Sequence, residues 1–494
     1  MNQATSKRII LNAVSAAVQV VVVGLMYFFL YKYLIKELGP AKLGIWALVI
    51  STSSIANFAN FGITSGLVKF VADFKEKGDA EQMHKLIFTA FLSIVGFFAV
   101  LIMVGYLCVD LIIHQVIEKQ YIGVALQLLP YALLCLFLNE IGGVYTSILE
   151  GFQKNYLRNI IYISMSVLFL LITYLLVPRF GLMGVAYAQV IQSAVIFVTA
   201  YVTGTTLLEG HAVFKWNWDK KIFKQLINYG SKFQLVSLLQ ILFEPTTKTL
   251  LTRFGGLAAV GYYEMASRLV NQVRALIVNA NQVMIPVVAQ ASHKGLDEVR
   301  RLYLRTMSVT LFINVPLICA VICFSGYISL YWIGHVEPAF TFPLIVLAVS
   351  MFFNIMCGPA YFSSLGQGKL NLLVYIHLFM AVLNVVLGFG LGYLFSANGV
   401  ILSWGTTFGF ASVLLIFYYQ RNLLISARQA FSRSDILLFC AGVIFAIATV
   451  IIIPHFNYSP VVLGLTLAVF LLIFLPLGIT NPNLKALVKK GAIA

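Results

Sequence analysis

The 494-residue chain carries one pattern of glycines twice, with an offset of about 215–217 positions between the two copies. Gly39 and Gly44 recur as Gly256 and Gly261. A repeat of this length, in a chain with no long polar separator, indicates that one unit of several helices has been duplicated. Three further matches share the offset: Lys77-Gly78 with Lys294-Gly295, Gly151 and Lys154 with Gly366 and Lys369, and Gly184-Val185 with Gly399-Val400.

The composition places the duplicated unit in a membrane. The chain is 61% hydrophobic and 10% charged, with a mean hydropathy of +0.94, and a soluble protein of that composition would expose too much apolar surface. Apolar stretches long enough to cross a bilayer as helices recur from end to end. We predict fourteen spans, at about 9–33, 44–72, 86–110, 122–149, 157–177, 182–207, 226–252, 257–288, 302–332, 339–364, 370–395, 399–420, 436–454 and 460–479.

The predicted fold is therefore an all-α polytopic membrane protein with about fourteen transmembrane helices. An offset of six spans preserves direction, so the two halves are expected to be parallel repeats, an architecture typical of transporters. We predict an N-terminal lobe of spans 1–6 (1–210), a cytoplasmic linker (211–225) and a C-terminal lobe of spans 7–12 (226–425). Spans 13 and 14, with a cytoplasmic tail, lie outside the repeat (426–494).

The net charge of the chain is +16, and the distribution of its Lys and Arg residues fits a membrane topology. Lys and Arg gather in alternate loops, and placing those loops in the cytoplasm satisfies the positive-inside rule and puts both termini there. The charge is spread along the chain, so nucleic acid is not expected as a partner. No Walker A sequence is present, and the six cysteines lie in apolar stretches without disulfide or zinc spacing. No metal or other cofactor is predicted.

Polar residues within the seventh and eighth spans supply the candidate site. Gln240, Glu244 and Lys248 share one helix face at steps of four. Further along, one sector of the eighth span carries Glu264, Arg268, Asn271 and Arg274, and Lys69 is a deep cation in the second span. A charge at bilayer depth costs several kcal/mol, so it normally faces protein or water. We expect a hydrated cavity between the lobes, walled by spans 1, 2, 7 and 8.

Cations outnumber carboxylates in this set, so the cavity is expected to attract an anionic group such as a phosphate. The predicted substrate-binding residues are Lys69, Lys248, Arg268, Arg274, Asn271 and Gln240. The alternative is that Glu244–Lys248 and Glu264–Arg268, both four residues apart, simply neutralise each other. Lys69 and Arg274 have no acidic neighbour at that spacing.

Glu244, Glu264 and Glu140 are the titratable candidates for coupling to an H⁺ or Na⁺ gradient. For Glu140, an interhelical hydrogen bond is the alternative.

Several segments resemble the Wzx-type polysaccharide flippases. These belong to the superfamily that also holds the multidrug (MATE) exporters and the lipid II flippases. The resemblance covers nearly the whole chain and consists mainly of glycines and aromatic residues at fixed offsets. It is carried by Ser6–Asn12, Leu38-Gly39-x4-Gly44-Ile45-Trp46, Phe61-Gly62-Ile63, Lys69-Phe70-Val71-Ala72, Leu149-Glu150-Gly151-Phe152-Gln153-Lys154, Gly181–Ala186 and Val260–Ala266.

The resemblance implies an alternating-access flippase in the bacterial inner membrane. Its substrate would be an undecaprenyl-pyrophosphate-linked oligosaccharide for O-antigen, capsule or exopolysaccharide assembly, with the pyrophosphate held by basic cavity residues. Spans 13 and 14 resemble the pair that forms a groove for the prenyl tail in lipid II flippases. Membrane lipids, a polysaccharide polymerase and a chain-length regulator are the further partners that the resemblance suggests.

Three rival functions differ in testable features. Multidrug exporters of organic cations usually carry an acidic residue in the first span, where this chain has Asn12, Ser15 and Gln19. A lipid II flippase would show that subfamily's basic and acidic pattern in the same span, and the sequence has no close match to it there. A membrane-embedded glycosyltransferase or polymerase would need a large outer loop, and the longest candidate, Asp110–Tyr121, is modest.

Overall fold

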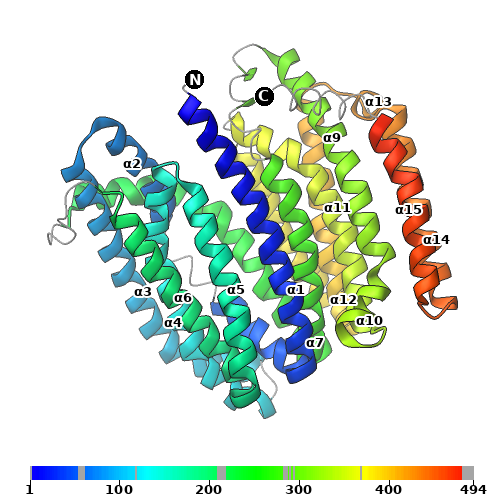
Figure 1. The fold of residues 1–494 in the computed structure, drawn as a ribbon, viewed down its shortest axis with the longest axis horizontal. Coiled ribbons are helices and arrows are strands. Elements are labelled where there is room, and N and C mark those ends of the chain that lie inside the picture. Colours follow the sequence, from blue (N-terminus) through cyan, green and yellow to red (C-terminus); the bar gives the residue numbers. More distant parts are fainter. Residues whose placement is uncertain are drawn as a thin grey trace. The chain divides into compact units, whose positions relative to one another are not determined.

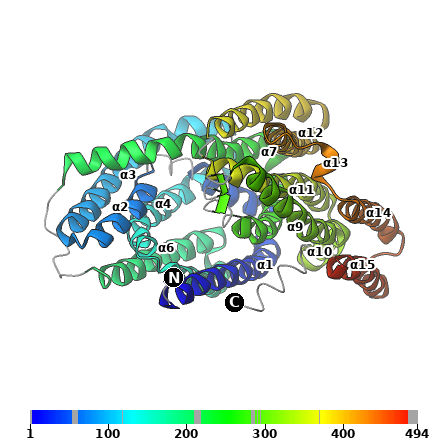
Figure 2. The ribbon, with the colours of Figure 1, turned by 90° about the horizontal axis from the view of Figure 1, so that it is seen from above.

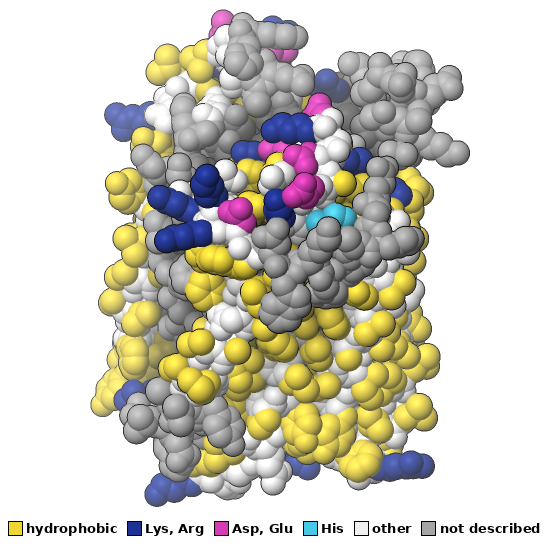
Figure 3. All heavy atoms as spheres, turned by 90° about the vertical axis from the view of Figure 1, so that its left-hand side faces the viewer, with side chains coloured by type: hydrophobic (Ala, Val, Ile, Leu, Met, Phe, Trp, Pro, Cys, Tyr) yellow, Lys and Arg dark blue, Asp and Glu magenta, His cyan; other side chains and the backbone are white. Residues whose placement is uncertain are grey.

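A computed structural model describes residues 3–53, 62–116, 119–208, 218–281, 287–288, 291–292, 295–367 and 370–480. The regular structure of these residues is helical throughout (Figure 1). Nine of the described helices are long and apolar enough to cross a membrane. On the face shown in Figure 3, hydrophobic side chains cover the middle while charged side chains gather toward the ends. The prediction of an all-α polytopic membrane protein is confirmed.

The chain divides into two compact units, 1–261 and 262–494. The division falls within the long helix α7, so unit 1 includes the seventh predicted span. The lobe boundaries that we expect from the sequence, at about 210, 226 and 425, stay a prediction.

Unit 1 is a bundle of six helices and the first part of a seventh. Its long apolar stretches form helices because every backbone polar group must be satisfied within the segment when water is absent. Within the bundle α4 packs on α6 and α2, and α5 packs on α1 and α6. The helices are α1 (Gln3–Ser53), α2 (Ile63–Lys77), α3 (Ala80–Val116), α4 (Ile122–Gly151), α5 (Asn155–Phe180), α6 (Leu182–Thr205) and the start of α7 (Lys220–Asn281).

Unit 2 consists of the remainder of α7 and the helices that follow it. In this unit α11 packs on both α12 and α9, and α14 packs on α9. The last two helices, α14 and α15, lie side by side at the edge of the unit (Figures 1 and 2). The helices are α9 (Leu296–Cys323), α10 (Ser325–Ile333), α11 (Pro338–Gly366), α12 (Leu370–Asn422), α13 (Ala427–Ala430), α14 (Arg433–His455) and α15 (Pro460–Thr480).

The sequence repeat is also a repeat of backbone conformation. Gly39 kinks α1 with φ 77° and ψ 170°, and Gly256 kinks α7 with φ 75° and ψ 175°. This combination of positive φ and extended ψ is essentially restricted to glycine. A second bend is repeated between Gly181 (φ 54°, ψ −132°), which joins α5 to α6, and Ser396 (φ 55°, ψ −138°), which lies within α12. The two copies therefore share these backbone bends.

Two equivalent glycines also touch each other. Within unit 1, a Cβ atom on Gly44 would collide with the carbonyl oxygen of Leu257, and one on Gly261 would collide with that of Pro40. Gly44 matches Gly261 and Pro40 matches Leu257 in the repeat, so the contact is reciprocal. Small residues allow helix backbones in membranes to approach this closely.

Candidate functional site

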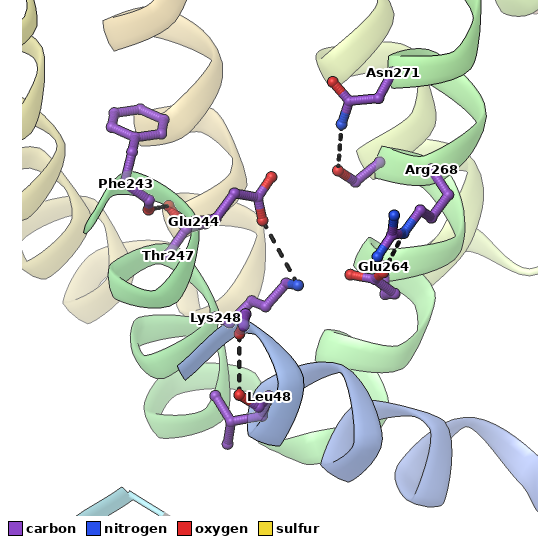
Figure 4. A network of polar contacts seen from close by, with 10 residues as sticks. Leu48, Phe243, Glu244, Thr247, Lys248, Glu264, Arg268 and Asn271 are labelled. Atoms are coloured by element: carbon purple, nitrogen blue, oxygen red, sulfur yellow. Dashed lines mark hydrogen bonds and ion pairs between the residues drawn. The ribbon is translucent and has the colours of Figure 1, made fainter. Parts of the chain in front are cut away.

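The predicted pair on the seventh span forms an ion contact. Lys248 Nζ lies 3.7 Å from Glu244 Oε2 on α7, in unit 1 (Figure 4). Lys248 is only 5% exposed, whereas the side chain of Glu244 is 37% exposed. The distance exceeds that of a good hydrogen bond, so Glu244 supplies a counter-charge rather than a tight contact.

The predicted pair on the eighth span is tighter. Arg268 Nε donates to Glu264 Oε1 at 2.7 Å in unit 2 (Figure 4). Here the carboxylate is the buried partner, at 3% exposure, and the guanidinium is half-exposed. A buried carboxylate needs a counter-charge, because desolvating an unpaired ion is costly. In both pairs the charges lie close enough to offset each other, which is the alternative interpretation of the sequence.

Arg274 has a different kind of partner. Its Nε donates to the amide oxygen of Asn354, on α11 of unit 2, at 2.7 Å. Among the residues that the structure describes, no carboxylate lies within ion-pair distance of this guanidinium. The positive charge of Arg274 is therefore held by a neutral group.

Among the four predicted site cations, Lys69 is the second that has no described carboxylate at ion-pair distance. It is exposed, and its Nζ lies 4.5 Å from the ring centroid of Tyr229, on α7, and 5.4 Å from that of Phe70. Such contacts stabilise a cation without removing its charge. They require α2 and α7 to approach closely, and Gly62 permits this because a Cβ there would meet the backbone of Gly230.

The remaining predicted residues are less informative. Asn271 donates to Ser267 Oγ at 3.1 Å along the same face of α7. Glu140 lies partly buried on α4. Gln240 belongs to α7, but its side chain lies outside the described residues.

The polar residues on one face of the first span, in α1, form hydrogen bonds with the start of α5. Asn12 Oδ1 accepts from the backbone N–H of Tyr156 at 2.9 Å, and its Nδ2 donates to the carbonyl of Gln153 at 3.0 Å. Ser15 forms a hydrogen bond with Asn159 one turn along α5. These contacts satisfy the backbone at the start of α5, where helix N–H groups lack intrahelical partners. The polar residues of this face thus join two helices of unit 1, whereas the sequence pattern favours a cavity wall.

The charges of the eighth span are specific to the second copy of the repeat. With the offset that aligns Gly39 with Gly256, the positions of Glu264, Arg268 and Arg274 fall on residues of the first copy that carry no charge. These are Ala47, Ser51 and Asn57. A structural repeat alone therefore does not account for the charges.

Comparisons with known proteins agree with this architecture. Residues 36–335 match a family model described as polysaccharide biosynthesis protein. A curated relative, the putative O-antigen transporter of Shigella flexneri, is 21% identical over 402 residues, or 79% of this chain and 92% of the relative.

The fold is shared with solved structures, among them the following two. The lipid II flippase MurJ, in an inward closed conformation, matches with a TM-score of 0.76 and 13% identity, over 98% of this chain and 100% of that one. An inward-facing MATE family multidrug transporter of the MOP superfamily matches with a TM-score of 0.72 and 14% identity, over 83% of this chain and 98% of that one.

Proposed function

We propose a function from one premise: this chain belongs to the polysaccharide biosynthesis protein family. It is a multi-pass membrane protein with the MOP-superfamily fold, and the relatives that it resembles are named as transporters and flippases. The proposal is that it translocates undecaprenyl-pyrophosphate-linked oligosaccharide repeat units across the bacterial inner membrane. It would act as a transporter, without enzymatic chemistry, for assembly of O-antigen, capsule or exopolysaccharide.

Arg274 is the observation that supports this proposal most strongly. By the sequence prediction Arg274 lies within the eighth span (257–288), and a cation at the centre of such a helix costs about 2.5–3.5 kcal/mol on insertion scales. No described carboxylate within ion-pair distance of Arg274 offsets that cost. An anionic substrate group would offset it, and a pyrophosphate needs such a partner because its charge cannot cross hydrocarbon unaided.

The other predicted residues have roles consistent with their contacts. Lys69 would attract the anion while it stacks on Tyr229. Lys248 and Arg268 would bind phosphate oxygens by exchanging their carboxylate partners for the substrate. Asn271 and Gln240 would donate to sugar hydroxyls. Glu244, Glu264 and Glu140 remain the candidates for coupling to an H⁺ or Na⁺ gradient, and no cofactor is needed.

The prenyl tail would stay in the lipid while the headgroup moves, in an alternating-access cycle. Both termini are proposed to lie in the cytoplasm, because that orientation satisfies the positive-inside rule. A polysaccharide polymerase and a chain-length regulator would act on the delivered repeat units. These partners follow from the family resemblance.

Transport of an organic cation is the main rival, because the fold is shared with MATE transporters. Arg274 and Lys69 argue against it, since uncompensated positive charge repels a cationic drug. Lipid II is the second rival, because the fold is also that of MurJ.

Leaflet transfer in proteoliposomes separates these functions. The purified protein is reconstituted with a fluorescent undecaprenyl-pyrophosphate oligosaccharide, with lipid II or with an organic-cation dye. The proposal predicts protein-dependent movement of the oligosaccharide lipid and none of the dye. Movement of the dye alone, or of lipid II in preference to the oligosaccharide lipid, would replace the proposal with the corresponding rival.

A further inference from the structure

Two arginines of α7 each donate a hydrogen bond through Nε, but the two acceptors differ chemically. Arg268 Nε donates to the carboxylate of Glu264 at 2.7 Å, and Arg274 Nε donates to the amide oxygen of Asn354 at the same distance. A carboxylate cancels the charge of its arginine, whereas an amide orients the guanidinium and leaves its charge in place. The chain thus contains one neutralised and one charged version of the same contact.

The surroundings of Arg274 on α11 are also neutral. Cys357 and Tyr361 follow Asn354 on one face of that helix, at steps of three and four residues. Both are close enough to interact electrostatically with the guanidinium. A thiol, a phenol and an amide carry no charge at neutral pH. This face of α11 therefore holds the arginine without adding a competing anion.

The hydrogen bond to Asn354 uses the Nε edge of the guanidinium. The two terminal nitrogens, Nη1 and Nη2, form the fork that binds two oxygens of a phosphate in parallel. In the described part of the chain, Nε is the only atom of Arg274 with a hydrogen-bond or ion-pair partner. The contact with Asn354 therefore leaves Nη1 and Nη2 without a described partner.

We propose that Asn354 is a positioning residue for the anionic headgroup of the substrate: it fixes Arg274 by Nε so that Nη1 and Nη2 grip a phosphate group of a pyrophosphate lipid. This proposal rests on the proposed function and adds a specific requirement to it. Residue 354 must be an uncharged acceptor, because an acidic residue would neutralise the arginine.

The matched test replaces the amide by the carboxylate that resembles it most in shape, in Asn354→Asp. Purified protein in detergent is titrated with geranylgeranyl pyrophosphate, and geranylgeraniol serves as the uncharged control ligand. We expect Asn354→Asp to weaken binding of the pyrophosphate lipid at least tenfold, about as much as Arg274→Ala does, with binding of the alcohol unchanged. The double variant Arg274→Ala/Asn354→Asp should bind no more weakly than Arg274→Ala, because the two residues act as one unit.

Asn354→Ala keeps the test decisive if the aspartate variant does not fold. Asn354→Ala removes the hydrogen bond that positions Arg274 but leaves the positive charge of Arg274 in place. Binding of the pyrophosphate lipid should therefore weaken several-fold when Asn354→Ala is made in the wild-type protein. It should not weaken further when Asn354→Ala is added to Arg274→Ala. Wild-type affinity in Asn354→Asp or Asn354→Ala, or losses that add to that of Arg274→Ala, would overturn the positioning role while leaving the proposed function intact. A wild-type protein that does not prefer the pyrophosphate over the alcohol would overturn both.

Discussion

Arg268 and Glu264 form an ion pair in which the carboxylate, not the guanidinium, is the buried partner. Removing either partner should therefore have unequal effects. Arg268→Gln leaves a buried carboxylate without this counter-charge, at a cost on the order of 2 kcal/mol. Glu264→Gln leaves a half-exposed guanidinium that can still reach polar surroundings.

We expect Arg268→Gln to lower the apparent Tm in detergent by several degrees more than Glu264→Gln does. Glu264→Gln should also tighten binding of a pyrophosphate lipid several-fold, because it releases a positive charge. Thermal unfolding and ligand titration of the two variants, side by side with wild type, measure both effects. Equal losses of Tm would show that the burial of Glu264 does not control the stability of the pair.

The contact between Gly44 and Gly261 predicts a strong steric effect. Gly44→Ala or Gly261→Ala places a Cβ against a carbonyl oxygen of the facing helix, so the backbones of α1 and α7 must separate. Both variants should lower the Tm markedly and reduce the yield of folded protein. Gly96→Ala in α3 is the matched control, because nothing lies within 4 Å of its Cβ position; alanine there should be neutral or mildly stabilising. Size-exclusion profiles and melting curves decide between these outcomes.

The contact between the Lys69 ammonium and the Tyr229 ring predicts that residue 229 must be aromatic. Tyr229→Phe keeps the ring under the ammonium and should keep transport near the wild-type rate. Tyr229→Leu removes a contact of about 0.5–2 kcal/mol, so the apparent KM for the lipid-linked oligosaccharide should rise about three- to tenfold. Initial rates of leaflet transfer at several substrate densities measure this. A phenylalanine variant as defective as the leucine variant would assign the effect to the Tyr229 hydroxyl instead.

The features that the sequence predicts well are those that helix geometry alone determines. Residues four apart on a helix meet, so the spacing of Glu244–Lys248 and Glu264–Arg268 is enough to predict both ion pairs. The absence of an acidic neighbour at that spacing singles out Lys69 and Arg274, and neither has a carboxylate at ion-pair distance among the described residues.

Features that depend on the packing of distant helices cannot be predicted in this way. Asn354 is a neutral residue within the apolar helix α11, and nothing in its periodicity connects it with Arg274. The polar helix face of Asn12 favours a cavity wall, yet the partners of this side chain are backbone groups at the start of α5. Ser396 adopts the positive φ of its repeat partner Gly181, where residue type alone gives no indication of a bend.

The most direct test of the central claim is leaflet transfer of the undecaprenyl-pyrophosphate oligosaccharide by Arg274→Ala and Arg274→Lys proteoliposomes, with the amount of inserted protein matched to wild type. The account predicts at least a tenfold loss of transfer in Arg274→Ala. Arg274→Lys should retain part of the rate, because lysine keeps the charge but lacks the two-pronged fork. Transfer by Arg274→Ala at the wild-type rate would contradict the claim that this cation carries the anionic headgroup.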